Sequence, residues 1–169
     1  VIQADSGSFT LGANVEIGYY DQEHHVLHMD KTIFEEISDD YPTLTNTQIR
    51  NMLAAFLFTG DDVFKEISAL SGGERGRVSL AKLMLSEANF LILDEPTSSL
   101  DEQEVEKLFG LMRDLRSRGV GIIFVTHFLD QVYEVCDKIT VLRDGKLVGE
   151  YEIKDLPRVK LVAKMLGKE

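Results

Sequence analysis

The stretch F-L-I-L-D-E-P-T, residues 90–97, decides the fold class, because four leading apolar residues are typical of a strand buried in a parallel sheet. The strand ends in two carboxylates, Asp94 and Glu95, and the carboxyl ends of strands are where α/β sheets bind ligands. We expect Asp94 to hold Mg²⁺ through its water shell, because hard cations prefer oxygen ligands. Glu95 would polarise an attacking water for in-line phosphoryl transfer. This stretch alone leaves an alternative open, a buried strand that ends in an acidic helix cap.

Helices are predicted on both sides of this strand. Ser71 and Glu74 have the spacing of a capping box, which predicts a helix from residue 71 to about residue 86. Asp101 and Glu104 repeat that spacing before a second helix, which Gly119 ends. The second helix has a stripe of apolar residues at helical spacing, made of Val105, Leu108, Phe109, Met112 and Leu115.

The rest of the C-terminal half continues the alternation. The dipeptide Asp144-Gly145 between two apolar stretches is a strong hairpin signal. Strand–helix–strand alternation with buried strands predicts a doubly wound α/β fold with a mostly parallel sheet. We expect the following elements: a buried strand over residues 120–126, a helix over about 129–136, hairpin strands over 138–143 and 146–151, and a helix over about 154–166.

The N-terminal part has a different pattern. Residues 8–20 alternate apolar and polar positions around a glycine, which predicts a short hairpin. Residues 31–65 have helical periodicity in two segments, and either Thr45 or Asn46 could cap the second helix. This region is therefore interpreted as a small helical insert, with apolar faces formed by Ile33, Phe34 and Ile37, and by Ile49, Met52, Leu53, Phe56 and Leu57.

Composition and charge narrow the functional classes. The chain has 169 residues, 44% of them apolar, which is enough for one domain with a core. A net charge of −11 disfavours non-specific binding to nucleic acid, and the arginines at 113, 116 and 118 are typical of a solvated helix face. No apolar run approaches the roughly 20 residues that span a bilayer. The single cysteine, Cys136, excludes an internal disulfide and is expected in the core.

A glycine-rich stretch, L-S-G-G-E at residues 70–74, precedes the carboxylate strand by twenty residues. Two glycines let backbone N–H groups approach an anion closely, and the following helix adds its dipole, which suits a terminal phosphate. L-S-G-G-E and L-D-E-P-T together resemble the signature and Walker B motifs of ATP-binding-cassette (ABC) ATPases, whose cofactors are ATP and Mg²⁺. The resemblance implies that Ser71, Gly72, Gly73 and Glu74 contact nucleotide.

The resemblance implies further site residues. Gln22, at the end of I-G-Y-Y-D-Q, is similar to the Q-loop glutamine, which contacts Mg²⁺ and the water in this family. S-S-L-D at residues 98–101 resembles the D-loop, which crosses the dimer interface, with Ser99 and Asp101 near the nucleotide. His127, directly after the next strand, resembles the switch histidine that senses the γ-phosphate. The implied catalytic residues are thus Glu95, His127 and Gln22, and the implied metal ligands are Asp94 and Gln22.

The resemblance also implies a P-loop NTPase-like fold with a helical signature subdomain. Residues 1–169 would be a partial ABC ATPase domain with four regions: the hairpin and Q-loop in 1–30, the helical subdomain in 31–70, the signature, Walker B, D-loop and switch core in 71–151, and the C-terminal helix in 152–169.

The 169 residues contain no G-x-x-x-x-G-K-S/T motif, and the chain begins at Val1. We therefore expect the N-terminal P-loop strand and helix to be missing. Their loss should leave unpaired strand edges and uncovered apolar surface. It should also leave the chain alone with weak or no ATP binding and no turnover, because the P-loop supplies the N–H groups and the lysine that hold the phosphates.

Two functional classes stay open from the sequence. The first is an ATPase cassette, incomplete in this chain, and the second is a non-catalytic module that offers residues 71–73 to a partner in trans. Both need a second ABC cassette. Residues 9–97 resemble the ABC-F group, which acts on ribosomes, whereas residues 97–169 resemble monosaccharide-importer subunits, so a chimera is one hypothesis.

These two resemblances imply different partners for the intact protein. An importer subunit would bind a membrane permease, and an ABC-F protein would bind the ribosome. Neither inserts into the membrane itself. We expect a cytoplasmic location, at the inner face of the cell membrane if the protein is an importer subunit.

Overall fold

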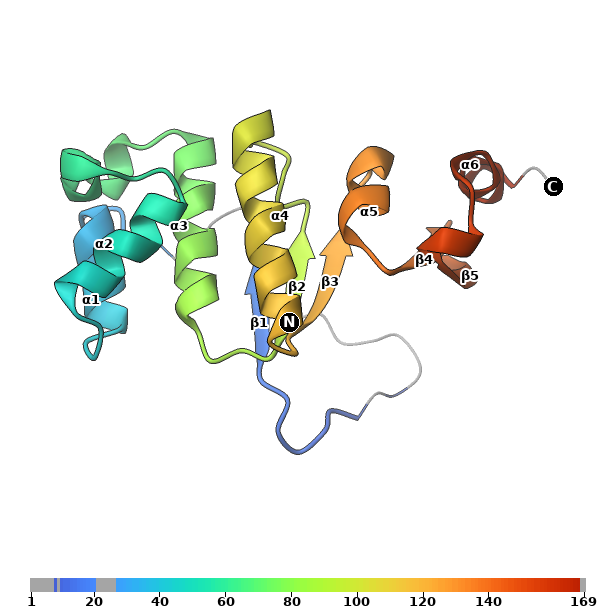
Figure 1. Ribbon diagram of the computed structural model, residues 1–169, viewed down its shortest axis with the longest axis horizontal. Helices are drawn as coiled ribbons and strands as arrows, with labels where there is room; N and C mark the ends of the chain where they lie inside the picture. The colour runs from blue at the N-terminus through green and yellow to red at the C-terminus, as the bar shows by residue number, and fades with distance from the viewer. Residues whose placement is uncertain (1–7, 9, 21–26, 168–169) are drawn as a thin grey trace.

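The computed structural model describes residues 8, 10–20 and 27–167. Its strands are β1 (Ile17–Tyr20), β2 (Phe90–Asp94), β3 (Gly121–Val125), β4 (Lys138–Arg143) and β5 (Lys146–Glu152). Its α-helices are α1 (Ile33–Asp40), α2 (Asn46–Ala55), α3 (Gly72–Leu85), α4 (Glu102–Ser117), α5 (Leu129–Val135) and α6 (Arg158–Leu166). Short 3₁₀ helices are η1 (Gly60–Phe64), η2 (Ile67–Ala69) and η3 (Ile153–Asp155). Helices α1 to α3 lie at one end of the molecule, β1 to β3 in the middle, and β4, β5 and α6 at the other end (Figure 1).

The centre of the fold is a parallel sheet with the strand order β1-β2-β3. The middle strand pairs with both neighbours, so that Leu93 lies between Tyr20 and Phe124. Leu93 is fully buried, and the ring of Phe124 meets Phe109 of α4 edge-on, with 6.0 Å between the centroids. Close packing also holds α3 against β1, because a Cβ on Gly18 would lie only 2.6 Å from a methyl carbon of α3. The expected α/β class with a parallel sheet is confirmed.

The opposite face of this sheet carries exposed apolar side chains. Side chains alternate between the faces of a strand, and α3 and α4 both pack against the same face. On the other face, 44 to 54% of the surface of each of four residues is exposed, namely Ile17, Tyr19, Ile123 and Val125. The expectations that β3 is buried on both faces and that the sheet is doubly wound are therefore wrong for the described residues, whereas the expected uncovered apolar surface is present.

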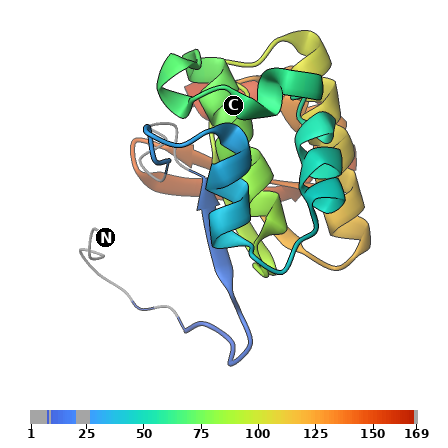
Figure 2. The same ribbon diagram turned by 90° about the vertical axis from the view of Figure 1, so that its left-hand side faces the viewer.

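Helices α1 and α2 pack beside α3, as two views of the molecule show (Figures 1 and 2). Both begin at capping boxes, Thr32 with Glu35 and Thr45 with Gln48, in which each side chain accepts a hydrogen bond from the other residue's backbone N–H. The second cap is Thr45, since Asn46 is already the first helical residue. The predicted apolar faces form the core here, with at most 1% exposure for Ile33, Ile37, Ile49 and Leu53.

A buried ion pair joins α1 to α3. The Glu36 carboxylate is fully buried and lies 2.5 Å from the ammonium of Lys82, which also contacts Asp40 at 2.7 Å. The backbone N–H of His28 donates to Glu36 at 3.3 Å. Burial disfavours the charged ammonium, but hydrogen bonds to Asp40 and Glu36 outweigh that effect and raise the pKa of Lys82. Lys82 therefore stays charged and fixes α3 relative to α1.

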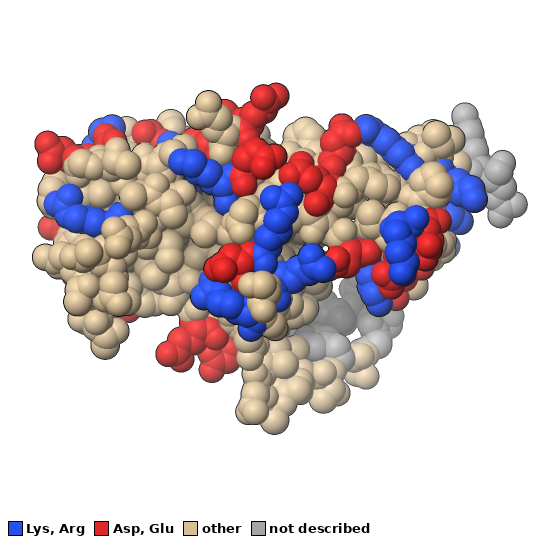
Figure 3. Space-filling model, viewed as in Figure 1, with Lys and Arg blue, Asp and Glu red and all other residues tan. Residues whose placement is uncertain are grey.

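The arginines of α4 lie in surface ion pairs with residues of α5 and the turn after it. Arg113 contacts Glu134 at 2.8 Å, and Arg116 contacts Asp137 at 2.6 Å. Arg118 pairs with an acidic residue of α4 itself. The space-filling view shows basic and acidic side chains mixed over this face (Figure 3). The predicted solvated helix face is confirmed.

The N-terminal hairpin predicted over residues 8–20 is wrong. Among the described residues of this range, only Ile17–Tyr20 form a strand, and that strand pairs in parallel with β2. Gly12 does lie in a turn, where the N–H of Val15 donates to its carbonyl at 3.2 Å. The alternating pattern reflected the two faces of one sheet strand, because pairing with a buried strand and covering by α3 bury more surface than a local hairpin.

The C-terminal helix begins later than the sequence predicted. Helix α6 starts at Arg158 rather than near residue 154, and residues 153–155 form η3. Pro157 explains the shift, because a proline disfavours helical conformation in the residue before it and suits a helix start. The β4–β5 hairpin formed as predicted, with positive φ angles at Asp144 and Gly145, and packs against α6 through Val141, Leu156 and Leu161.

Two more expectations concern the position of Cys136 and the presence of membrane-spanning helices. Cys136 is partly buried directly after α5 rather than fully in the core, and burial raises the pKa of its thiol to about 11. Across the described part of the chain, no helix combines the length and the apolar character needed to cross a bilayer.

The buried ion pair generates a first prediction. Replacing Lys82 with Met should lower the free energy of unfolding by about 3 kcal/mol, because the buried Glu36 carboxylate loses the ammonium and keeps only its contacts with His28. The control is Lys138→Met, which removes an exposed ion pair with Glu152 and should change stability by less than about 0.5 kcal/mol. Urea unfolding followed by circular dichroism measures both, and equal effects of the two substitutions would contradict the prediction.

Candidate functional site

The carboxyl ends of β2 and β3 bring two of the predicted catalytic residues together. Glu95 follows β2 and His127 lies two residues after β3, so parallel pairing places both at one edge of the sheet. The Nδ1 atom of His127 lies 2.8 Å from Oε1 of Glu95. The hydroxyl of Thr126 donates to the other carboxylate oxygen at 3.5 Å and accepts from the N–H of Phe128 at 3.1 Å. His127 thus contacts one oxygen of the Glu95 carboxylate, and Thr126 contacts the other.

The backbone of Glu95 has a φ of +46°, in the left-handed region that costs a non-glycine residue roughly 1 kcal/mol. Its N–H still donates to the carbonyl of Val125 at 2.9 Å, so the strand pairing extends to this residue. Its carbonyl accepts from Ser98 in the following turn. Such strain is often found at functional sites, where the surrounding structure maintains it.

Asp94 is the last residue of β2 and is partly buried. The hydroxyl of Tyr19, from the neighbouring strand β1, lies 3.4 Å from its Oδ2 atom. Oxygen donors of this kind suit Mg²⁺, whose remaining ligands are commonly water and phosphate. Within residues 8, 10–20 and 27–167, no three His, Cys, Asp or Glu side chains cluster as a metal site. Gln22, the other predicted metal ligand, lies outside the described residues.

A buried hydroxyl links the loop after β2 to helix α5. The side chain of Thr97 is only 4% exposed and donates to the amide oxygen of Gln131 at 2.7 Å. Sequence reasoning missed Thr97, Gln131, Thr126 and Tyr19. The sequence did show that Thr126 stands next to His127 and that Tyr19 lies in the predicted strand before Gln22. Only the pairing of the strands shows which residues these two side chains contact.

The second group of predicted residues lies at the N-terminus of α3. Ser71 caps this helix as predicted, its hydroxyl accepting from the N–H of Glu74 at 3.2 Å. The N–H of Ser71 donates to the Glu74 carboxylate at 2.8 Å, and this bond lowers the pKa of Glu74. Gly72 is exposed, and a Cβ there would meet nothing within 4 Å. Because Gly72 has no side chain, the backbone N–H at this position of the first helical turn is accessible to an anion.

Gly73 brings the predicted signature and D-loop segments into contact. A Cβ on Gly73 would lie 2.6 Å from the carbonyl oxygen of Ser99, so only glycine fits. Asp101 caps α4, where its carboxylate accepts from the N–H of Glu104 at 2.9 Å, while its own N–H donates to the Glu104 carboxylate at 2.8 Å. The loop from Glu95 to Asp101 therefore connects the two groups of site residues.

The contact at Gly73 generates a second prediction. Gly73→Ala should lower the free energy of unfolding by about 2 kcal/mol, because the added methyl overlaps a backbone oxygen that cannot rotate away. Gly72→Ala is the matched control, and should be neutral or stabilise by up to about 1 kcal/mol, since alanine favours helix and the site is open. Denaturant midpoints of the two variants would refute this if they were the same.

Comparisons with known proteins show which curated sequences this chain resembles. YdiF of Bacillus subtilis is 40% identical over 154 residues, 89% of this chain and 24% of its own length. The galactofuranose transporter ATP-binding protein YtfR of Escherichia coli is 55% identical over 108 residues, 64% of this chain. The ribose import ATP-binding protein RbsA of Lacticaseibacillus paracasei is 37% identical over 138 residues. The chain spans about a quarter of the length of these relatives, 22 to 28%.

The fold and the sequence family are also matched. The ATP-binding cassette MJ0796, solved as a dimer in a post-hydrolysis state with ADP and Pi, aligns with a TM-score of 0.70 and 21% identity, over 82% of this chain and 63% of that one. This likeness supports the P-loop NTPase-like fold. The family described as ABC transporter matches residues 9–98, just over half of the chain. The chain therefore belongs to the ABC transporter family, as part of its ATPase domain.

Proposed function

We propose that this chain forms the signature, Walker B, D-loop and switch parts of a cassette that binds and hydrolyses ATP against a second cassette. The observation that carries the proposal is the contact between Glu95 and His127, at the edge of the sheet where phosphoryl-transfer residues would have to meet. In this proposal residues 31–70 are the helical subdomain and residues 71–151 the catalytic core.

Each residue of the first group has a distinct role in the proposal. Glu95 accepts the proton of the attacking water, and His127 and Thr126 orient its carboxylate through the contacts described above. His127, whose side chain is largely exposed, can also reach a terminal phosphate. Asp94 would help to hold Mg²⁺, and the family resemblance gives Gln22 the same role. When bound, Mg²⁺ neutralises charge that develops on the transferred phosphoryl group.

The second group acts on a nucleotide held by the other cassette. Ser71 caps a 14-residue helix whose first turn contains Gly72, Gly73 and Glu74, and the glycine N–H groups and the helix dipole favour an anion there. Ser99 lies next to that turn, at Gly73, and Ser99 and Asp101 would contact the same interface. The cassette MJ0796 is a dimer with ADP and Pi, which supports a second cassette as the partner.

Sugar import is the cycle that we propose for the intact protein. The names of the relatives YtfR and RbsA, galactofuranose transporter and ribose import subunits, support it. The proposal implies a membrane permease as partner and a cytoplasmic location at the inner face of the membrane. The ABC-F resemblance, the ribosome as partner and the chimera hypothesis stay predictions.

A non-catalytic module remains the alternative, and under both hypotheses the 169-residue chain alone should bind nucleotide weakly. Titration of the 169-residue chain with Mg-ATP should give a Kd weaker than about 1 mM, because the sequence lacks the P-loop N–H groups and lysine. Titration with Mg-AMP provides the background heat. A Kd near about 1 μM for the monomer would contradict this expectation.

The role of Glu95 is tested in a cassette in which a P-loop strand and helix precede these residues. Glu95→Gln should lower turnover at least about 100-fold while nucleotide stays bound, because the amide cannot accept the proton of water. Glu102→Gln, in the exposed first turn of α4, is the control and should leave turnover unchanged. Phosphate release and filter binding measure both properties. Unchanged hydrolysis in Glu95→Gln would rule out the role, and no turnover in the unsubstituted cassette would favour the non-catalytic module.

A further inference from the structure

Arg77 extends the contact between α3 and the loop that precedes α4. It lies four residues after Gly73 in α3, so both residues are on the same face of the helix. Gly73 packs on the carbonyl of Ser99, and one turn later Arg77 reaches Glu104 of α4. The two segments therefore touch at two successive turns of α3.

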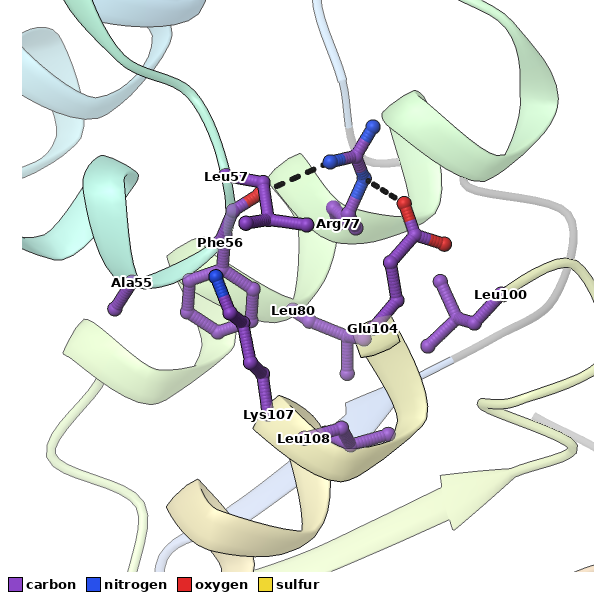
Figure 4. A pocket seen from close by; sticks show the side chains of 9 residues that line it. All are labelled: Ala55, Phe56, Leu57, Arg77, Leu80, Leu100, Glu104, Lys107 and Leu108. Carbon is purple, nitrogen blue, oxygen red and sulfur yellow. Dashed lines mark hydrogen bonds and ion pairs between the residues drawn. The ribbon is translucent and has the colours of Figure 1, made fainter. Parts of the chain in front are cut away.

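The guanidinium of Arg77 makes three contacts at once, and Figure 4 shows those with Glu104 and with Phe56. Its Nε atom lies 3.1 Å from Oε1 of Glu104, an ion pair without hydrogen-bond geometry, and its Nη1 donates to the carbonyl of Phe56 at 3.2 Å. Its planar group also lies over the ring of Phe58, 4.9 Å from the centroid. Only 14% of the Arg77 side chain and 12% of the Glu104 side chain are exposed. A planar fork with several donors suits this combination, which a lysine cannot reproduce.

Glu104 transmits this contact to Asp101. One of its oxygens faces Arg77, while the other accepts the N–H of Asp101 at 2.8 Å. The N–H of Glu104 in turn donates to the Asp101 carboxylate. Arg77 thus orients a side chain whose second oxygen fixes the end of the loop at residues 98–101.

The surroundings make Arg77 difficult to replace. The small pocket beside the ion pair is lined mainly by apolar side chains, among them Leu57, Leu80, Leu100 and Leu108. Lys107 is the other cationic residue that lines this pocket, and it is exposed to solvent. Loss of Arg77 would leave the Glu104 carboxylate poorly solvated and without a cation at its Oε1 atom.

We infer that Arg77 is a positioning residue, which keeps residues 98–101 in register with the signature loop of the same chain. The two loops then meet a second cassette as one rigid surface. This inference rests on the proposed function for its purpose, but the contact itself is a property of the chain without nucleotide.

Hydrogen–deuterium exchange of the nucleotide-free chain tests the inference. Arg77→Met should raise the exchange rates of the Asp101 and Glu104 amides about 10-fold, a change that corresponds to losing one hydrogen bond to a charged group. Amides of β4 and β5, which pair far from the substitution, should keep their rates. Arg77→Lys should recover only part of the protection, because it restores the charge without the fork. Lys107→Met, in the same pocket, should leave the two reporter amides unchanged.

A second variant keeps the test decisive if Arg77→Met unfolds the chain. Glu104→Gln retains an oxygen for the N–H of Asp101 but removes the charge that Arg77 meets, and should raise exchange at Asp101 several-fold. Rates within twofold of the unsubstituted chain in both variants would overturn the inference, as would an equal increase in Lys107→Met. Because no nucleotide is present, a failed ATP titration leaves this result unaffected.

Discussion

The pairing of β2 with a parallel neighbour on each side is the constraint on which the rest of the structure depends. It places Asp94 beside Val125, so that the chain after β2 and the chain after β3 emerge at the same edge. The same pairing brings Glu95 and His127 within 2.8 Å, although 31 residues separate them in the sequence. The candidate catalytic group is therefore a direct consequence of strand order.

The proposed signature loop, residues 70–74, depends on a second set of contacts. Helix α3 packs against β1 at Gly18 and is held to α1 by the buried pair of Glu36 and Lys82. Its N-terminus, with Gly73, then rests on the loop that leaves β2. The helical part and the sheet are thus connected at both ends of one helix. A shift of α3 would move the signature loop and the loop at residues 98–101 together, which is the coupling that Arg77 reinforces.

Local signals in the sequence predicted most elements well. Capping boxes at Ser71 and Asp101 and the dipeptide Asp144-Gly145 each fix backbone geometry within four residues, so they needed no tertiary information. The hairpin predicted over residues 8–20 is wrong. An alternating apolar and polar pattern indicates a strand with two different faces, but it does not show which other strand pairs with it. The predicted start of the last helix near residue 154 is also wrong, because Pro157 controls the local backbone conformation and the helix begins only after it.

The sequence by itself determined the residue types of the site and their order: two carboxylates after a buried strand, a glycine pair before a helix, and a histidine after the next strand. These features can be read from the residue types and from the number of residues between them in the sequence. Only the tertiary structure decided their partners, such as Thr126 on Glu95, Gln131 on Thr97 and Glu104 on Arg77. Such pairs lie 27 to 34 residues apart, and their contacts depend on how separate elements pack, which short-range patterns do not encode.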